Sequence, residues 1–297
     1  MRLFQLLMVL LAAFPAAAQI DIGGPWQTKQ HEDLPERGPG PRIGDYSGMP
    51  VNDSTRLRGD SWVAEQLAMV EHQCQEHPAD YEPRGPSNMR IWPEVDRLTQ
   101  AVIAWHTTTS YNLPERTIYM DGRPHPPEWA PHTWQGFSTG EWEGDMLKVT
   151  TTHLREGWMR RNGLARSDRA DLVEYFVRHH DYLTLFSITY DPVYATAPVL
   201  RSSDWFMNEG MQLTPNLCIF SIEIDYPRGF VPHHLPGKNP WLTEFPEQTG
   251  IPYEAMRGGE ETMYPEYQKK MAQMPSPPPR PVSKDAESPE RSSEGGE

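Results

Sequence analysis

Short segments rich in β-branched and aromatic residues recur along the middle of the chain, and their spacing limits the possible folds more than any other feature. About seven or eight such segments lie between residues 99 and 226, separated by turn residues. They cover residues 101–111, 116–120, 137–142, 146–154, 170–178, 182–190, 197–206 and 217–224. The 31 prolines and 22 glycines disfavour long helices, and no βαβ rhythm or glycine-rich nucleotide loop is visible. We therefore predict a mainly β fold, an antiparallel, lipocalin-like barrel or a sandwich, over residues 99–226.

The segment before this β domain, residues 19–98, has an irregular sequence. We predict an N-terminal arm that packs on the barrel, because the large ring of Trp26 gains from burial. A disordered leader is the alternative. One helix candidate lies at residues 52–67, with Asn52 or Asp53 as its N-cap.

The segment after the β domain is also irregular. Residues 227–274 are predicted to form an extension that holds one short helix beyond residue 260. Residues 275–297 contain almost no apolar side chains, so they cannot bury enough surface to offset the entropy lost on ordering. We predict that these last residues form a disordered tail.

The first 18 residues have the three parts of a secretory signal peptide. Arg2 gives a positive start, residues 3–14 are apolar, and Ala16, Ala17 and Ala18 form a small-residue cleavage site. A buried N-terminal helix or a membrane anchor is the alternative, but the apolar run is shorter than the roughly 20 residues that cross a bilayer. We predict cleavage after Ala18, export to the periplasm or beyond, and no membrane span in the mature chain.

The formal charge of the chain is −14. An acidic surface repels phosphate backbones and anionic lipid, so nucleic acid is a poor partner and docking on such lipid is disfavoured. We expect a small-molecule ligand instead. No organic cofactor is predicted.

The chain has two cysteines, Cys74 and Cys218. In an oxidising compartment an isolated pair forms a disulfide more often than two free thiols. We predict the bridge, and two buried thiols are the alternative.

The densest group of polar side chains lies in the sequence DGRPHPP, residues 121–127. Prolines restrict the backbone, so such a loop can hold Arg123 and His125 in fixed directions at the mouth of a barrel. The alternative is structural, with Asp121 paired to Arg123 and the prolines forming a stable crossover. Binding residues gather on loops held by rigid scaffolds, which keeps the functional interpretation open.

Three histidines, His125, His132 and His153, could meet near this loop. Three imidazoles suit zinc or copper, but spacings of 7 and 21 residues match no known metal signature. The alternative is that each is hydrogen-bonded within the fold. On the strand at 146–154, alternation would place His153 on the face that carries Leu147. Trp134, a large ring in the same loop region, completes the candidate ligand-binding set, which is Asp121, Arg123, His125, His132, Trp134 and His153.

Several long motifs resemble a large family of secreted bacterial proteins of unknown function that is common in proteobacteria and acidobacteria. They include ERTIYMDGRPHPP, HTWQGFSTGEWEGDMLKVTTTHLREGW and YDPVYATAP, and the resemblance covers roughly residues 21–226. Both cysteines fall where relatives look to have cysteine. The family segment GRWEGDTLVV is GEWEGDMLKV here, with Glu141 in place of the usual arginine, so the resemblance implies no role for a positive charge at this position. It implies no activity.

Three functional classes remain open from the sequence. The leading hypothesis is an exported protein that binds a small, partly apolar molecule at the mouth of the barrel. The second is a periplasmic hydrolase, lyase or isomerase that uses a histidine general base or a histidine-bound metal. The third is a structural or partner-binding protein of the cell envelope.

Overall fold

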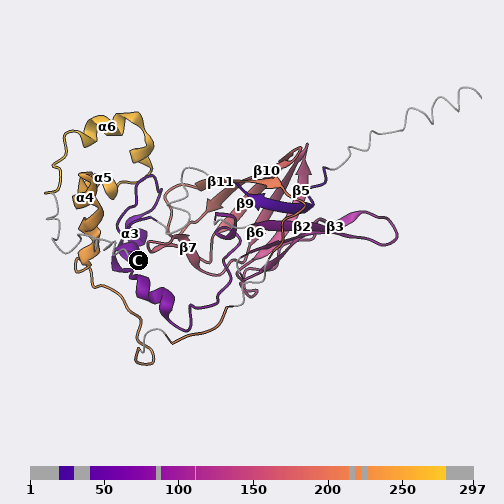
Figure 1. Cartoon of the computed structure of the whole chain (residues 1–297), viewed down its shortest axis with the longest axis horizontal. Coiled ribbons are helices and arrows are strands. Elements are labelled where there is room, and N and C mark those ends of the chain that lie inside the picture. Colours follow the sequence, from indigo (N-terminus) through magenta and orange to yellow (C-terminus); the bar gives the residue numbers. More distant parts are fainter. Residues whose placement is uncertain are drawn as a thin grey trace, which may run out of the picture.

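The computed structural model describes residues 20–29, 41–84, 88–110, 112–213, 218–222 and 226–278. The predicted signal peptide, residues 1–18, lies outside the described residues. So does the predicted disordered tail, except for residues 275–278. Figure 1 shows the strands at one end of the molecule and most of the helices at the other.

Within the described chain, the larger sheet closes into a barrel. The order of neighbouring strands is β1-β11-β10-β9-β6-β5-β4-β3-β2, and β2 pairs with β1. The strands are β1 (Gly24–Thr28), β2 (Met89–Val95), β3 (Val102–Thr109), β4 (Glu115–Tyr119), β5 (Phe137–Glu143), β6 (Met146–Thr152), β9 (Asp171–His179), β10 (Tyr182–Tyr190) and β11 (Val199–Met207). The predicted mainly β fold and the barrel are confirmed.

Two barrel strands were not predicted, and they come from the segment expected to be an irregular arm. In β1, Trp26 lies opposite Met207 of β11 on one side and Met89 of β2 on the other. Pro25 lies within β1 and Pro93 lies within β2. Because proline cannot donate a ladder hydrogen bond, its presence argues against a strand, and both strands were missed for this reason. The predicted boundary at residue 99 is therefore wrong, since the barrel begins at β1.

One pair of neighbouring strands, β4 and β5, is parallel, so the barrel is mixed, and its other neighbouring pairs are antiparallel. Ile118 lies opposite Ser138, and Tyr119 lies opposite Thr139. Parallel neighbours need a long crossover rather than a tight turn. The proline-rich loop at residues 120–136 is this crossover. A second correction concerns residues 217–224, because their described part, 218–222, has no strand.

The barrel interior contains a packed apolar core. Three tryptophans in it, Trp26, Trp105 and Trp205, are at most 3% exposed. The other buried members are Ile22, Met89, Ile91, Ile118, Leu147, Val149, Phe176, Leu183 and Leu185. Large rings that fill a small barrel in this way make its interior a core rather than a ligand-binding lumen.

The remaining elements lie outside the barrel. Helix α3 (Asp53–Ser61) begins at the predicted cap Asn52, whose side chain accepts a hydrogen bond from the Thr55 N–H at 3.1 Å. Short 3₁₀ helices follow at η1 (Ala64–Ala68) and η2 (Glu82–Arg84). Residues 155–169, between the predicted strands at 146–154 and 170–178, hold the small sheet of β7 (Gly157–Arg160) and β8 (Leu164–Arg166).

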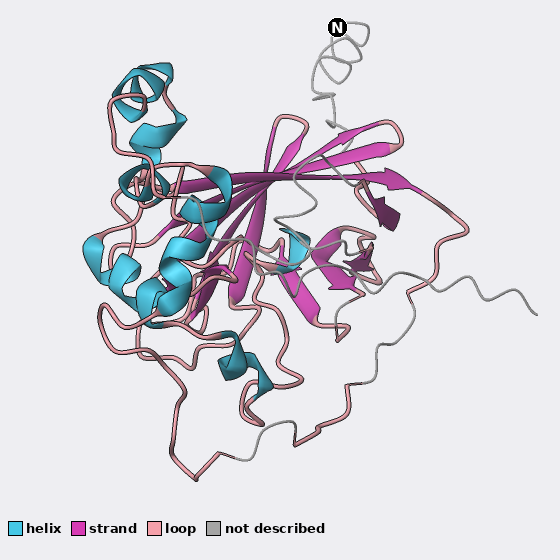
Figure 2. Cartoon of the chain, turned by 60° about the vertical axis from the view of Figure 1, so that its left-hand side comes forward, coloured by secondary structure: helices cyan, strands magenta, loops and turns pink. Residues whose placement is uncertain are grey.

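The C-terminal extension contains more helix than predicted. Its elements are η3 (Pro240–Thr243), α4 (Glu244–Thr249), α5 (Tyr253–Met256), η4 (Glu260–Met263) and α6 (Pro265–Met271). Figure 2 shows most of the helices gathered at one side of the strands. None of the helices in the described ranges is long and apolar enough to cross a membrane.

The predicted disulfide is confirmed. Cys74 and Cys218 are bonded, with their Cα atoms 5.4 Å apart and a sequence separation of 144. The bridge joins the segment before β2 to the chain that follows β11. In sequence, the two cysteines therefore lie on either side of strands β2 to β11.

Candidate functional site

Asp121 and Arg123, at the start of the β4–β5 crossover, bind each other. The Arg123 guanidinium donates to the Asp121 carboxylate at 2.6–3.0 Å, and it lies 3.8 Å from the centre of the Tyr119 ring. The hydrogen bond from Arg123 lowers the pKa of Asp121 to about 2. Both side chains are about two-fifths exposed, at 39% and 44%. Asp121 and Arg123 therefore pair as in the structural interpretation of this loop.

His125 lies between two strands of the barrel wall. Its Nδ1 is 2.8 Å from the Thr152 hydroxyl of β6, and its Nε2 is 2.8 Å from the Thr139 hydroxyl of β5. The edge of the Phe137 ring packs against it, with centroids 5.3 Å apart. Partial burial and the nearby His153 ring lower the pKa of His125, so the imidazole is neutral at pH 7.

His153 lies just past the end of β6, with a φ of +59°. This left-handed conformation ends the alternation, so His153 leaves the face that carries Leu147, where the sequence predicted it. Its Nε2 is 3.0 Å from the Pro127 carbonyl and its Nδ1 is 2.7 Å from the Thr152 hydroxyl. The strand end therefore holds the proline-rich loop against the barrel.

These contacts admit a continuous set of proton positions in which each imidazole carries one proton. A carbonyl only accepts, so His153 carries its proton on Nε2 and its Nδ1 accepts from the Thr152 hydroxyl. The Thr152 oxygen then accepts from Nδ1–H of His125. The remaining nitrogen of His125 accepts from the Thr139 hydroxyl. The result is one continuous chain of hydrogen bonds from the loop to β5.

His132 and Trp134 lie beside this chain. The His132 and His153 rings have centroids 5.1 Å apart, and Nδ1 of His132 donates to the Leu154 carbonyl at 3.0 Å. Arg155 covers the Trp134 ring at 5.6 Å and also donates to the His132 carbonyl at 3.0 Å. The structure thus brings His125, His132 and His153 together, as the sequence suggested.

The histidine cluster is a hydrogen-bonded assembly and does not have the geometry of a metal centre. Both nitrogens of His125 and both of His153 contact protein partners. Across the described ranges, no three His, Cys, Asp or Glu side chains are placed to hold one metal ion. Asp171 is a carboxylate that interacts electrostatically with His125 and His153. Burial raises its pKa, and the two histidines offset part of that rise.

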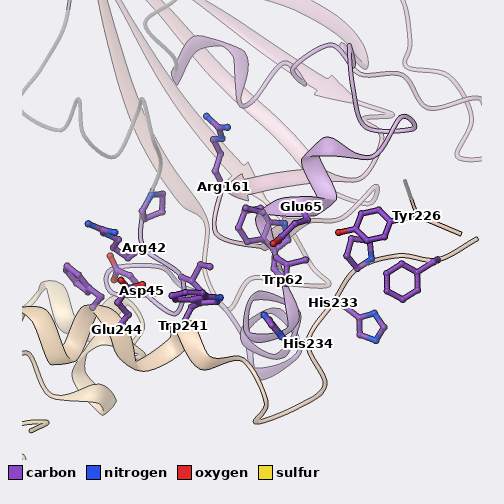
Figure 3. Close-up of a pocket in the computed structure, with 17 residues that line it drawn as sticks. Arg42, Asp45, Trp62, Glu65, Arg161, Tyr226, His233, His234, Trp241 and Glu244 are labelled. Atoms are coloured by element: carbon purple, nitrogen blue, oxygen red, sulfur yellow. The ribbon is translucent and has the colours of Figure 1, made fainter. Parts of the chain in front are cut away.

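A cavity of about 990 Å³ lies away from this cluster, between the N-terminal segment and the C-terminal extension. Neither the tryptophans nor the histidines of its wall were among the residues singled out from the sequence. Its wall consists of Pro41, Arg42, Ile43, Asp45, Trp62, Val63, Ala64, Glu65, Arg161, Tyr226, Phe230, Pro232, His233, His234, Trp241, Glu244 and Phe245. In Figure 3 the helix that carries Trp241 and Glu244 faces the segments that carry Arg42 and Trp62.

Contacts between distant segments hold this cavity together. Arg257 of the extension donates to both carboxylate oxygens of Asp60 at 2.6 and 2.7 Å, and Tyr46 donates to Asp60 at 2.7 Å. The Asn239 side chain donates to the Asp60 carbonyl at 2.8 Å, and the His234 N–H donates to the Ser61 carbonyl at 2.8 Å. The end of α3 is therefore the point at which the two walls meet.

The cavity wall combines aromatic surface with a few charged groups. Trp62 is 7% exposed, and its buried indole N–H has no hydrogen-bond partner among the described residues. Trp241 is 46% exposed, and the Tyr226 and Phe230 rings pack with centroids 5.3 Å apart. The only sequence signal for this wall was tryptophan outside the predicted strands.

No family model, curated protein or solved structure matches the chain.

Proposed function

We propose that the protein is an exported binding protein for a small, partly apolar molecule, and that the ligand occupies the cavity between Trp62 and Trp241. The observation that carries the proposal is a cavity of about 990 Å³ with an aromatic wall and a few charged groups. Sites for small molecules are concave and mostly apolar, with a few polar groups that orient the ligand. Export rests on the predicted signal peptide, and the disulfide is compatible with an oxidising compartment.

The same ligand class was first expected at the barrel mouth, and the geometry favours the cavity instead. Asp121 and Arg123 neutralise each other, and the barrel interior is filled by its own core. The indole N–H of Trp62, by contrast, is a buried donor that finds no acceptor in the described part of the chain, and a ligand oxygen could accept its hydrogen bond. Burial of such a donor without a partner costs free energy that a ligand would recover.

Acid–base catalysis at the histidine cluster is the second candidate. It is supported by the lowered pKa of His125 and the raised pKa of Asp171, because shifts of this kind gather at catalytic sites. Both nitrogens of His125 already contact threonine hydroxyls, however, so a substrate would have to displace one of them. Binding in the cavity therefore ranks first.

The test uses N-phenyl-1-naphthylamine, a neutral apolar dye whose fluorescence rises on transfer out of water. We expect saturable binding to the wild-type protein, and a loss of affinity of roughly fivefold or more in Trp241→Ala, because an aromatic wall residue is removed. Native mass spectrometry of the exported protein would then identify the molecule that co-purifies.

Trp129→Ala is the matched control, since Trp129 is 85% exposed and does not line the cavity. This variant should bind the dye as the wild type does. Equal losses in the two variants, or no saturable binding in the wild type, would contradict the proposal.

A further inference from the structure

A second cavity, of about 420 Å³, brings together three arginines from segments that lie far apart in the sequence. Arg84 ends η2, Arg160 ends β7, and Arg201 lies on β11. No residue of this wall is shared with the cavity between Trp62 and Trp241. The two cavities are therefore separate sites.

The guanidinium groups of Arg84 and Arg201 converge on one acceptor. Arg84 donates to the Met159 carbonyl at 3.3 Å, and Arg201 donates to the same oxygen. A carbonyl oxygen is neutral, so it orients the two cations without balancing their charge. The next residue in the chain, Arg160, has a buried Nη1 group with no hydrogen-bond partner among the described residues.

Asp80 and Glu260 are carboxylates near these arginines. Asp80 accepts from Nε of Arg166 at 2.9 Å, and both of those side chains are buried. Glu260 lines the cavity but is exposed to solvent. Burial first, and then the charge of Arg84, lower the pKa of Arg201 to about 9, while Asp80 acts in the opposite direction. The wall of this cavity therefore carries three arginines and one acidic side chain, Glu260, in a chain whose formal charge is −14.

We infer that the cavity lined by Arg84, Arg160 and Arg201 is a binding site for a small oxyanion, either inorganic phosphate or the carboxylate of a small molecule. Guanidinium groups present paired N–H donors in a plane that matches the oxygens of carboxylate and phosphate. An oxyanion would add negative charge beside the three arginines of the wall. It would also give the buried N–H of Arg160 an acceptor.

A purely structural role for the arginines makes a different prediction. Buried like charges without enough counter-charge cost free energy, so replacing one of them would then leave stability unchanged or raise it, whether or not anion is present. If the site binds an oxyanion, the substitution must instead change the affinity for that anion. Anion titrations of matched variants separate these two cases.

The experiment is isothermal titration calorimetry of the full mature protein at pH 7 and constant ionic strength, with inorganic phosphate in one series and succinate in another. We expect saturable binding in at least one series, and the series with the higher affinity identifies the class of oxyanion. Arg160→Gln should weaken that binding about tenfold or more, because one charge-assisted hydrogen bond is lost. Arg97→Gln, at an exposed position in the β2–β3 turn, is the control and should bind as the wild type does.

A second variant keeps the test independent of any loss of folding in Arg160→Gln. Glu260 is exposed and carries the opposite charge to the cavity, so Glu260→Gln should strengthen anion binding by about threefold. The inference is overturned if neither anion binds saturably to the wild type, or if both variants bind with wild-type affinity. The neutral naphthylamine dye reports on the other cavity, so the two proposals can fail separately.

Discussion

Arg116 and Glu174 form a buried ion pair within the barrel, and both are at most 4% exposed. The guanidinium of Arg116 also donates to the hydroxyls of Ser138 at 3.0 Å and Thr151 at 2.8 Å. Nearby, burial raises the pKa of the Glu82 carboxyl to about 8, although Arg116 acts to lower it. At neutral pH the Glu82 carboxyl near this ion pair is therefore mostly protonated. Removing either member of the ion pair would leave the other charge buried and unpaired.

A histidine outside the cluster gives a prediction about acid stability. Burial, reinforced by the charge of Arg161, lowers the pKa of His77 from 6.5 to about 4. Between these values the unfolded chain binds a proton that the folded chain does not, so stability falls as the pH falls from about 6.5 to about 4. Between pH 7 and pH 4.5, we expect the free energy of unfolding of His77→Gln to fall by about 2–3 kcal/mol less than that of the wild type.

Urea unfolding at the two pH values measures this effect. His179→Gln, at an exposed position at the end of β9, should keep the wild-type loss of stability. A His77→Gln protein that loses as much stability on acidification as the wild type would show that His77 is not the group responsible.

At the scale of elements, β1 decides whether the barrel closes. It is only five residues long, yet it pairs with β2 on one edge and β11 on the other. Its central residue, Trp26, is fully buried and donates from Nε1 to the Ile22 carbonyl at 2.9 Å. The short strand is held by its packing as well as by its few ladder hydrogen bonds.

The strand gives a prediction about global stability. Trp26→Ala should lower the free energy of unfolding by about 3–5 kcal/mol, because it removes a large ring from a packed core. Trp26→Phe should cost less, because most of the apolar surface remains. Chemical denaturation followed by circular dichroism measures both. A change below about 0.5 kcal/mol in Trp26→Ala, as expected for an exposed site, would mean that β1 is not part of the cooperative unit.

At the scale of the whole molecule, segments that lie far apart in the sequence are linked to each other outside the barrel. The Arg257–Asp60 ion pair links the extension to α3, and the Cys74–Cys218 bridge links the chain before β2 to the chain after β11. Because both proposed cavities have walls from distant segments, their shape depends on these links. Loosening them should weaken ligand binding before the barrel itself unfolds.

The disulfide can be tested directly. A loop of 144 residues is closed by the bridge, so Cys74→Ala combined with Cys218→Ala should lower the free energy of unfolding by about 4–5 kcal/mol in the chain-entropy account. Urea unfolding with and without a reductant measures the effect. The reductant should destabilise the wild type and leave the double variant unchanged. Equal stability of the two oxidised proteins would contradict the prediction.

The local features of the fold could be predicted because their signals lie close together in sequence. Asn52 caps α3 as expected, because the interaction spans three residues. Alternation of side chains placed β3 to β6 and β9 to β11 with small errors at the ends. His153 is the instructive exception, since a single residue with positive φ ends the alternation and turns a predicted inward residue toward the loop.

The sequence by itself determined that the chain is mainly β, where most strands lie, and which two cysteines could pair, because periodicity, turn chemistry and a single cysteine pair need no knowledge of distant contacts. Only the tertiary structure decided that Trp26 closes the barrel between Met89 and Met207, that β4 and β5 run parallel, and that three arginines share one cavity. These features join residues separated by tens to more than a hundred positions. The physical reason is that burial and charge balance depend on which surfaces meet, and this is settled only when the whole chain packs.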